Sequence, residues 1–216
     1  IVQGLSGDVP YYHCPGIRSR TDTDTDTDTR SSSSLSLGSN NHKSIVLLHG
    51  SRFTKEDWKT SGILEKLCAS GDASSSTSSS SSSYSLSVTA LDLNVRSNHE
   101  VLQQTLIGLA ANNLVTLPIT AIVTPSASGF AVIDWLRQDD QAGIGIGIGI
   151  VAGMQQNYVQ AWIPIASPSI SLPTDAQLAA LAAQTPVPFP VLAIYGSRDG
   201  LGQQVSERLK RLANAK

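Results

Sequence analysis

The stretch from Ile119 to Phe130 constrains the fold of this chain most strongly, because an apolar, β-branched run delivers one serine into a turn of small residues. The run predicts a buried strand, and the residues after Ser126 predict a tight turn that opens a helix. This layout is typical of a nucleophile elbow, where the residues two before and two after the serine must be small. Thr124 and Ser128 stand where the commoner G-x-S-x-G pattern has glycines. A plain Ser/Pro turn between a strand and a helix is the alternative interpretation.

Two further apolar runs end in turns that carry polar side chains. The run Ser44–Leu48 stops at the pair His49-Gly50, and its continuous apolar character predicts a doubly buried strand of a parallel sheet. The run Phe189–Tyr195 predicts another buried strand, and the Gly-rich turn after it contains Asp199. Taken alone, an aspartate at such a place is ordinary turn chemistry.

Helical and strand patterns alternate between these runs. Thr54 opens a helix with the character of a capping box, and the apolar spacing continues this helix through Cys68. The other expected elements are strands over 88–93 and 161–166, and helices over 100–114, from the elbow through Trp135, over 175–184 and after Asp199. This order predicts one α/β domain over residues 1–216, with a mainly parallel sheet covered by helices on both faces.

The sequence resembles the α/β-hydrolase superfamily, and within it the α/β-hydrolase domain-containing protein 14 family, particularly its 14B branch. The resemblance rests on HGSRF with the downstream Trp58, on the elbow TPSASG and on PVLAIYGSRDGLGQ, and residues 1–12 fit the first hairpin of that family. It covers most of the chain outside the low-complexity tracts, and it implies the α/β-hydrolase fold. Residues 92–99 depart from it, because relatives usually have a Gly-rich turn after the aspartate at this place.

By this resemblance, Ser126 is the nucleophile and Asp199 the acid of a Ser-Asp-His triad, while the N–H groups of Ser51 and Ala127 form the oxyanion hole. The implied reaction is acyl transfer from an ester or amide, as in an esterase or a deacylase. Residues 138–156 suggest no cap domain, which favours a small acyl group. No metal ion or bound cofactor is expected, although the family also suggests acetyl transfer from acyl-lysine to coenzyme A.

Two other classes of protein remain as alternatives to an enzyme. One is a non-catalytic protein-binding module built on the same scaffold. The other is a doubly wound domain that binds a nucleotide, and the lack of any G-x-G-x-x-G after a predicted strand argues against it.

The histidines limit the mechanism that this chain can carry out by itself. The chain has four histidines, and all of them precede Ser126: His13, His42, His49 and His99. In this fold, however, the catalytic base follows the acid in the sequence. A histidine directly before a glycine, as His49 is, more often shapes its loop than acts as a base. We therefore expect a fragment that is incomplete at both ends, lacks the segment with the catalytic histidine and is itself inactive. A relative that is naturally inactive is the alternative.

Composition restricts the partners. The net charge of -2 gives no indication of nucleic acid or of an anionic membrane, and no run reaches the roughly 18 apolar residues of a membrane span. Cys14 and Cys68 lie far apart and in no metal-ligand spacing, which predicts two reduced thiols. We expect a cytoplasmic monomer that binds a small acylated substrate, with a protein partner left open.

Three low-complexity tracts interrupt the predicted domain: alternating Thr-Asp followed by serines over 21–34, a serine tract over 74–83 and a Gly-Ile tract over 143–150. The first two are too polar to bury surface, which predicts disordered insertions over about 18–41 and 72–84. Calcium binding or phosphorylation of the threonines is the alternative role of the first tract. The Gly-Ile tract, expected to be flexible, lacks the lysine and Ser/Thr of a phosphate-binding loop.

Overall fold

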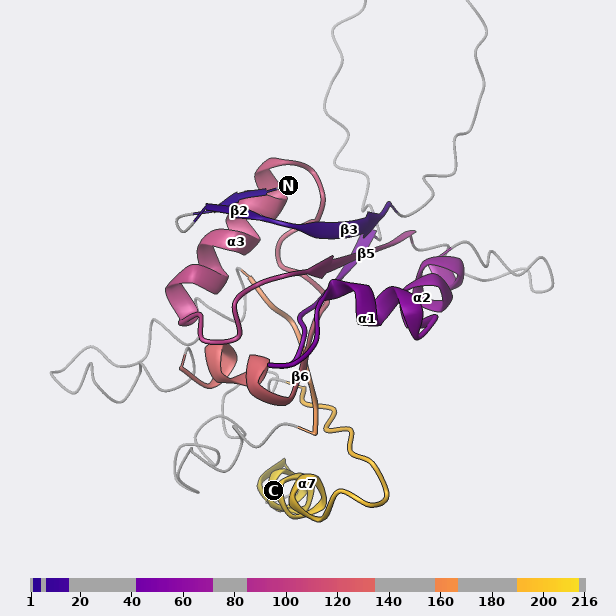
Figure 1. Cartoon of the computed structure of the whole chain (residues 1–216), viewed down its shortest axis with the longest axis vertical. Helices are drawn as coiled ribbons and strands as arrows, with labels where there is room; N and C mark the ends of the chain where they lie inside the picture. Colours follow the sequence, from indigo (N-terminus) through magenta and orange to yellow (C-terminus); the bar gives the residue numbers. More distant parts are fainter. Residues whose placement is uncertain are drawn as a thin grey trace, which may run out of the picture.

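A computed structural model of the chain describes residues 2–4, 7–15, 42–71, 85–134, 158–166 and 190–213. Its centre is a sheet in the strand order β3-β5-β4-β6-β7 (Figure 1). These strands are β3 (Tyr11–Cys14), β4 (His42–Leu47), β5 (Ser85–Leu91), β6 (Ala121–Pro125) and β7 (Trp162–Ile165). β3 is antiparallel to β5, and the other pairs are parallel. The predicted α/β fold with a mainly parallel sheet is therefore confirmed.

Helices cover both faces of this sheet (Figure 1). α1 (Lys55–Thr60) and α2 (Ile63–Gly71) lie on one face, while α3 (His99–Ala111) and the helical residues 129–134 lie on the other. Successive strand residues point to opposite faces, so Leu47 packs in one buried cluster with Trp58, and Leu48 in the other with Leu102. None of the helices in the described part of the chain is long and apolar enough to cross a bilayer.

A hairpin precedes the sheet, as the resemblance implied. β1 (Val2–Gly4) and β2 (Gly7–Val9) pair antiparallel, with Val2 opposite Val9. Val9 is buried in the cluster that α3 covers, and β1 lies beside α3. The hairpin therefore extends the covering of that face of the sheet.

The helix predicted from Thr54 through Cys68 is two helices in the structure. Its capping box is present, because the Thr54 hydroxyl accepts the Glu56 N–H at 3.2 Å and the Asp57 carboxylate accepts the Thr54 N–H at 2.7 Å. The prediction of one continuous helix was wrong, since α1 ends at Thr60 and Gly62 has a φ of +71°. Glycine adopts this left-handed conformation without steric cost, which lets the chain turn and begin α2 on a new axis.

Residues 190–195 do not form the continuous buried strand that the sequence predicted. Val191 and Ile194 make isolated parallel bridges to Trp162 and Ile165. Leu192 is 60% exposed and Ile194 is 44% exposed, and the residues between and beside them are half-buried. An extended segment with one face packed alternates in this way, whereas a doubly covered strand is buried throughout.

Several predictions fall on residues outside those that the structure describes: the insertions at 18–41 and 72–84, the Gly-Ile tract, Phe189, Trp135 and the helix over 175–184. The helix after Asp199 is present as α7 (Gly200–Ala213), which Figure 1 shows below the sheet and apart from α1, α2 and α3.

Cys14 and Cys68 form a disulfide, so the prediction of two reduced thiols was wrong. Their Cα atoms lie 6.0 Å apart although 54 residues separate them in the sequence. β3 pairs with β5, and α2 packs on β5, so both cysteines come to the same side of the sheet. Separation along the chain could not reveal this pairing, because the long-range strand order brings it about.

We predict that reduction of the Cys14–Cys68 disulfide lowers the free energy of unfolding by up to about 4 kcal/mol, since a bridge across 54 residues restricts the unfolded chain. Denaturant unfolding with and without dithiothreitol measures the difference. A variant with both Cys14→Ser and Cys68→Ser is the control and should unfold at the reduced midpoint in either buffer. Equal midpoints for the oxidised protein and this variant would contradict the prediction.

Candidate active site

Ser126 lies at the turn between β6 and a short 3-10 helix, η1 (Ser126–Ser128), which leads into the helical residues 129–134. Its φ is +52°, in the left-handed region that a residue with a side chain seldom adopts. The residue with this strained backbone is the same serine that the sequence indicates as the candidate nucleophile. A strained serine between a strand and a helix has the geometry of a nucleophile elbow.

The two residues that replace glycines in this elbow are both held by hydrogen bonds of their side chains. Thr124 is fully buried, and its hydroxyl accepts the indole N–H of Trp162 at 2.7 Å. Ser128 is 4% exposed, and its hydroxyl donates to the Pro125 carbonyl at 2.8 Å. The larger side chains are therefore accommodated because the hydroxyl of each is hydrogen-bonded to a neighbouring group. Ser128 is accordingly engaged in the turn itself.

The loop after β4 meets the elbow at Gly50. The Leu48 N–H donates to Val123 of β6 at 2.9 Å, and the indole of Trp58 donates to the Leu48 carbonyl at 2.8 Å. A Cβ added at Gly50 would lie 3.0 Å from the Phe53 ring and 3.4 Å from the Ser126 Cβ. A side chain at this position would therefore crowd the Phe53 ring and lie in contact with Ser126.

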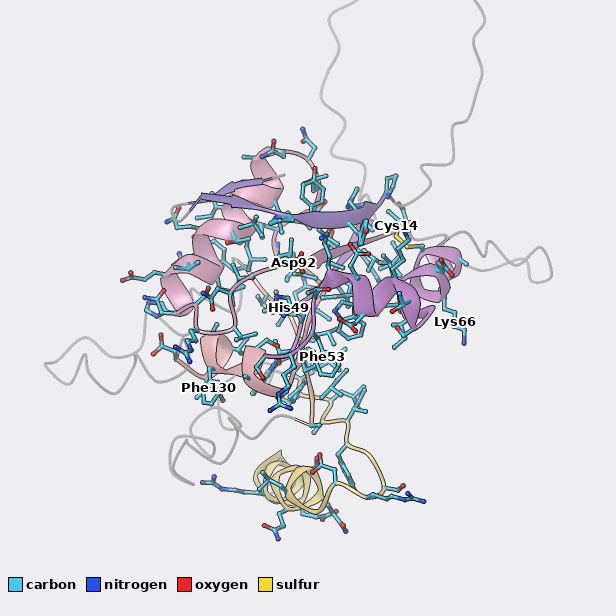
Figure 2. The ribbon with its side chains drawn as sticks, in the orientation of Figure 1. Cys14, His49, Phe53, Lys66, Asp92 and Phe130 are labelled. Atoms are coloured by element: carbon cyan, nitrogen blue, oxygen red, sulfur yellow. A yellow bond between two sulfur atoms is a disulfide. The ribbon has the colours of Figure 1, made fainter. Side chains whose placement is uncertain are left out.

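The two candidate oxyanion donors lie on the segments that meet at Gly50. Ser51 is exposed in the turn after Gly50, and Ala127 is half-buried in η1. Two exposed aromatic side chains extend from the same segments, with Phe53 at 52% and Phe130 at 39% exposure (Figure 2). The structure thus brings Ser126, Ala127 and the Gly50 loop together.

No hydrogen bond or ion pair among the described residues joins Asp199 to this group. Its carboxylate accepts the N–H of Gly202 at 2.9 Å, and its carbonyl accepts the N–H of Gln203. A Cβ added at Gly202 would strike the same carboxylate at 2.3 Å. Asp199 therefore caps the N-terminus of α7, a contact that sequence analysis had considered only as general turn chemistry.

A polar network lies at the carboxyl ends of β4 and β5. His49 Nδ1 is 2.8 Å from the Gly50 carbonyl, and its Nε2 is 4.0 Å from Asp92 (Figure 2). The Lys55 ammonium contacts Asp92 at 2.8 Å. Burial alone would raise the pKa of Asp92, but the bonds from Lys55 hold it below its ordinary value, and the bond to Asp92 raises the pKa of Lys55. The described residues contain no group of three potential metal ligands.

The remaining histidines also have partners. His13 contacts Thr89 at 2.9 Å, and His42 contacts Ser85 at 3.1 Å. His99 is buried at the start of α3, and its Nδ1 lies 2.8 Å from Asp134 of the elbow helix. Sequence analysis missed this last pair, since only the packing of α3 beside residues 129–134 brings the two side chains together.

The comparisons with known proteins bear on the family. No protein-family model matches the chain. The Pongo abelii protein named "Putative protein-lysine deacylase ABHD14B" is 27% identical over 182 residues, which cover 80% of this chain and 70% of that protein. This similarity and the mainly parallel sheet support a relationship of the chain to the α/β-hydrolases.

We predict that Gly50→Ala lowers the rate of a Ser126-dependent reaction more than it lowers stability. The added methyl must displace the Phe53 ring, which would lie 3.0 Å away, and it approaches Ser126 itself. Phe53 is 52% exposed and can move aside, so the loss of stability should stay below the roughly 1–3 kcal/mol that overpacking costs in a core. Ester hydrolysis and thermal unfolding should be measured on one preparation of the protein at its natural length. Gly196→Ala is the matched control, because a Cβ there meets nothing within 4 Å, and an equal loss in both variants would contradict the prediction.

Proposed function

We propose that this chain is the scaffold of a serine hydrolase that transfers a small acyl group from an ester or amide, with Ser126 as nucleophile. The observation that carries the proposal is the strained Ser126 turn directly beside Gly50. A tight elbow next to a loop that can direct an N–H group at the substrate is the arrangement that acyl transfer needs. We assign the oxyanion donors to the N–H groups of Ser51 and Ala127.

In the proposed reaction, the Ser126 oxygen attacks the acyl carbon and its proton passes to a base. The C–O or C–N bond to the leaving group then breaks, and the base returns the proton to that group. Water attacks the acyl-enzyme next, which releases the acid and restores the Ser126 hydroxyl. We propose a histidine outside these 216 residues as base, because the four present precede Ser126 and have other contacts. Asp199 would orient that histidine.

Acyl-lysine is the second candidate substrate, with coenzyme A as acceptor. The name of the Pongo abelii relative as a protein-lysine deacylase favours an amide substrate. In this version the thiol of coenzyme A takes the place of water and leaves with the acyl group as a thioester. A non-catalytic protein-binding module remains the competing class, and it would retain the fold without reactivity at Ser126.

The disulfide bears on the cellular compartment that we propose for the protein. Composition predicted the cytoplasm, where glutathione keeps most thiols reduced. The Cys14–Cys68 disulfide instead favours an oxidising compartment.

We predict that a fluorophosphonate probe labels the protein at its natural length and that Ser126→Ala abolishes the labelling. Ser128→Ala is the matched control. This variant should keep the labelling and lose about 1 kcal/mol of stability, because it removes a buried hydrogen bond to Pro125. Labelling that survives Ser126→Ala and is lost in Ser128→Ala would reverse the assignment, and an unlabelled protein would favour the binding module.

A pair of substitutions at Asp199 separates its proposed catalytic role from its capping of α7. Asp199→Asn keeps a side-chain oxygen for the Gly202 N–H but removes the charge. In the protein at its natural length, the rate of ester hydrolysis should therefore fall strongly with little change in stability. Asp199→Ala should lower the rate as much and also cost about 1 kcal/mol through loss of the cap. If Asp199→Asn leaves the rate unchanged, Asp199 is a helix cap alone.

A further inference from the structure

His49 makes its shortest contact with the carbonyl of the residue that follows it. Its Nδ1 lies 2.8 Å from the Gly50 oxygen. A carbonyl oxygen can only accept, so Nδ1 carries the proton in this contact. The same oxygen accepts the N–H of Phe53 at 3.1 Å. Two donors from different positions therefore hold one carbonyl group in place.

The carbonyl of Gly50 belongs to the same peptide unit as the N–H of Ser51. This unit is planar and trans, so the C=O and N–H bonds point in opposite directions and cannot turn independently. Fixing the Gly50 oxygen consequently fixes the direction of the Ser51 N–H. The peptide unit lies next to the elbow, because a Cβ on Gly50 would be 3.4 Å from the Ser126 Cβ.

The other ring nitrogen of His49 faces Asp92. Nε2 lies 4.0 Å from Asp92, and the side chain of His49 is 13% exposed. Asp92 is in turn anchored by the ammonium and the backbone N–H of Lys55. Figure 2 shows three of its labelled residues, Asp92, His49 and Phe53, in this order from top to bottom near the centre of the molecule. The ring of His49 is thus oriented between Asp92 and the Gly50 carbonyl.

We infer that His49 is a positioning residue, which fixes the Ser51 N–H as an oxyanion donor by holding the Gly50 carbonyl. The inference rests on the proposed acyl transfer at Ser126. It also assigns His49 a role other than that of base, since one ring nitrogen is bonded to Gly50 and the other faces Asp92. The oxyanion develops only in the transition state, so a misdirected Ser51 N–H should reduce kcat and leave KM nearly unchanged.

Two substitutions separate the two nitrogens of His49. The amide nitrogen of asparagine is bonded to Cγ, as Nδ1 is, so His49→Asn keeps a donor for the Gly50 oxygen. The amide nitrogen of glutamine stands one bond farther out, at the place of Nε2, so His49→Gln loses the donor to the Gly50 oxygen. In the protein at its natural length, p-nitrophenyl acetate hydrolysis should keep a kcat within about 3-fold of the wild type in His49→Asn and fall by about 10-fold or more in His49→Gln, with KM unchanged in both.

Labelling of Ser126 by a fluorophosphonate gives the number of folded sites, and kcat is divided by that number so that partial unfolding does not imitate the effect. Equal rates in His49→Asn and His49→Gln, whether both normal or both abolished, would overturn the inference; the abolished case would make the imidazole itself essential. If the wild type is labelled at Ser126 and the two variants have equal rates, the role of His49 is contradicted and the proposed function is not. A wild type without Ser126-dependent labelling removes the proposed function and the inference with it.

Discussion

The strained backbone of Ser126 is the constraint on which the site depends. A serine with a φ of +52° persists only where its surroundings determine the conformation. Here β6 is fixed between β4 and β7, the Thr124 hydroxyl is bonded to Trp162, and the Ser128 hydroxyl is bonded back to Pro125. These contacts hold the turn from the strand side and from the helix side. In this unusual elbow, hydrogen bonds of two hydroxyl groups therefore restrict the turn at the positions where two glycines would leave the backbone flexible.

The backbone beside the elbow is ordered by a comparable arrangement. Trp58 holds the Leu48 carbonyl, while Phe53 and His49 hold the Gly50 carbonyl. The loop between β4 and α1 thus has two of its carbonyl groups fixed, by the side chains of Trp58 and His49 and by the backbone N–H of Phe53. This arrangement gives physical meaning to the run HGSRF and the downstream tryptophan, which the sequence alone offered only as a resemblance.

Local patterns predicted much of the fold, and long-range contacts account for what they missed. Apolar runs at Leu47 and Ile122 were sufficient for the central strands, because parallel strands buried on both faces leave a continuous apolar signal. The same signal misled at Leu192 and Ile194, which are apolar but exposed. The pairing of Cys14 with Cys68 depends on strand order, which periodicity does not encode.

The candidate site, like the fold, was predictable where it depends on local motifs and not where it depends on long-range contacts. The elbow and the Gly50 loop could be identified because each is a short, contiguous motif at the end of a strand. The contacts of His49 with Asp92 and of His99 with Asp134 join residues 43 and 35 positions apart, and no local pattern marks them. The capping of α7 by Asp199 was within reach of the sequence, since an aspartate three residues before a helical N–H is a familiar cap.

The disulfide gives the chain a closed covalent ring that runs from Cys14 to Cys68 and contains the Thr-Asp tract, β4, the Gly50 loop and α1. A protease that cuts the chain once within this ring opens it without separating the two pieces. The N-terminal hairpin then stays attached to the part that carries Ser126 for as long as the bond is oxidised. A nicked, two-chain form of the protein would therefore keep the composition of the intact molecule, and the redox state of its surroundings would decide whether it stays one molecule or becomes two.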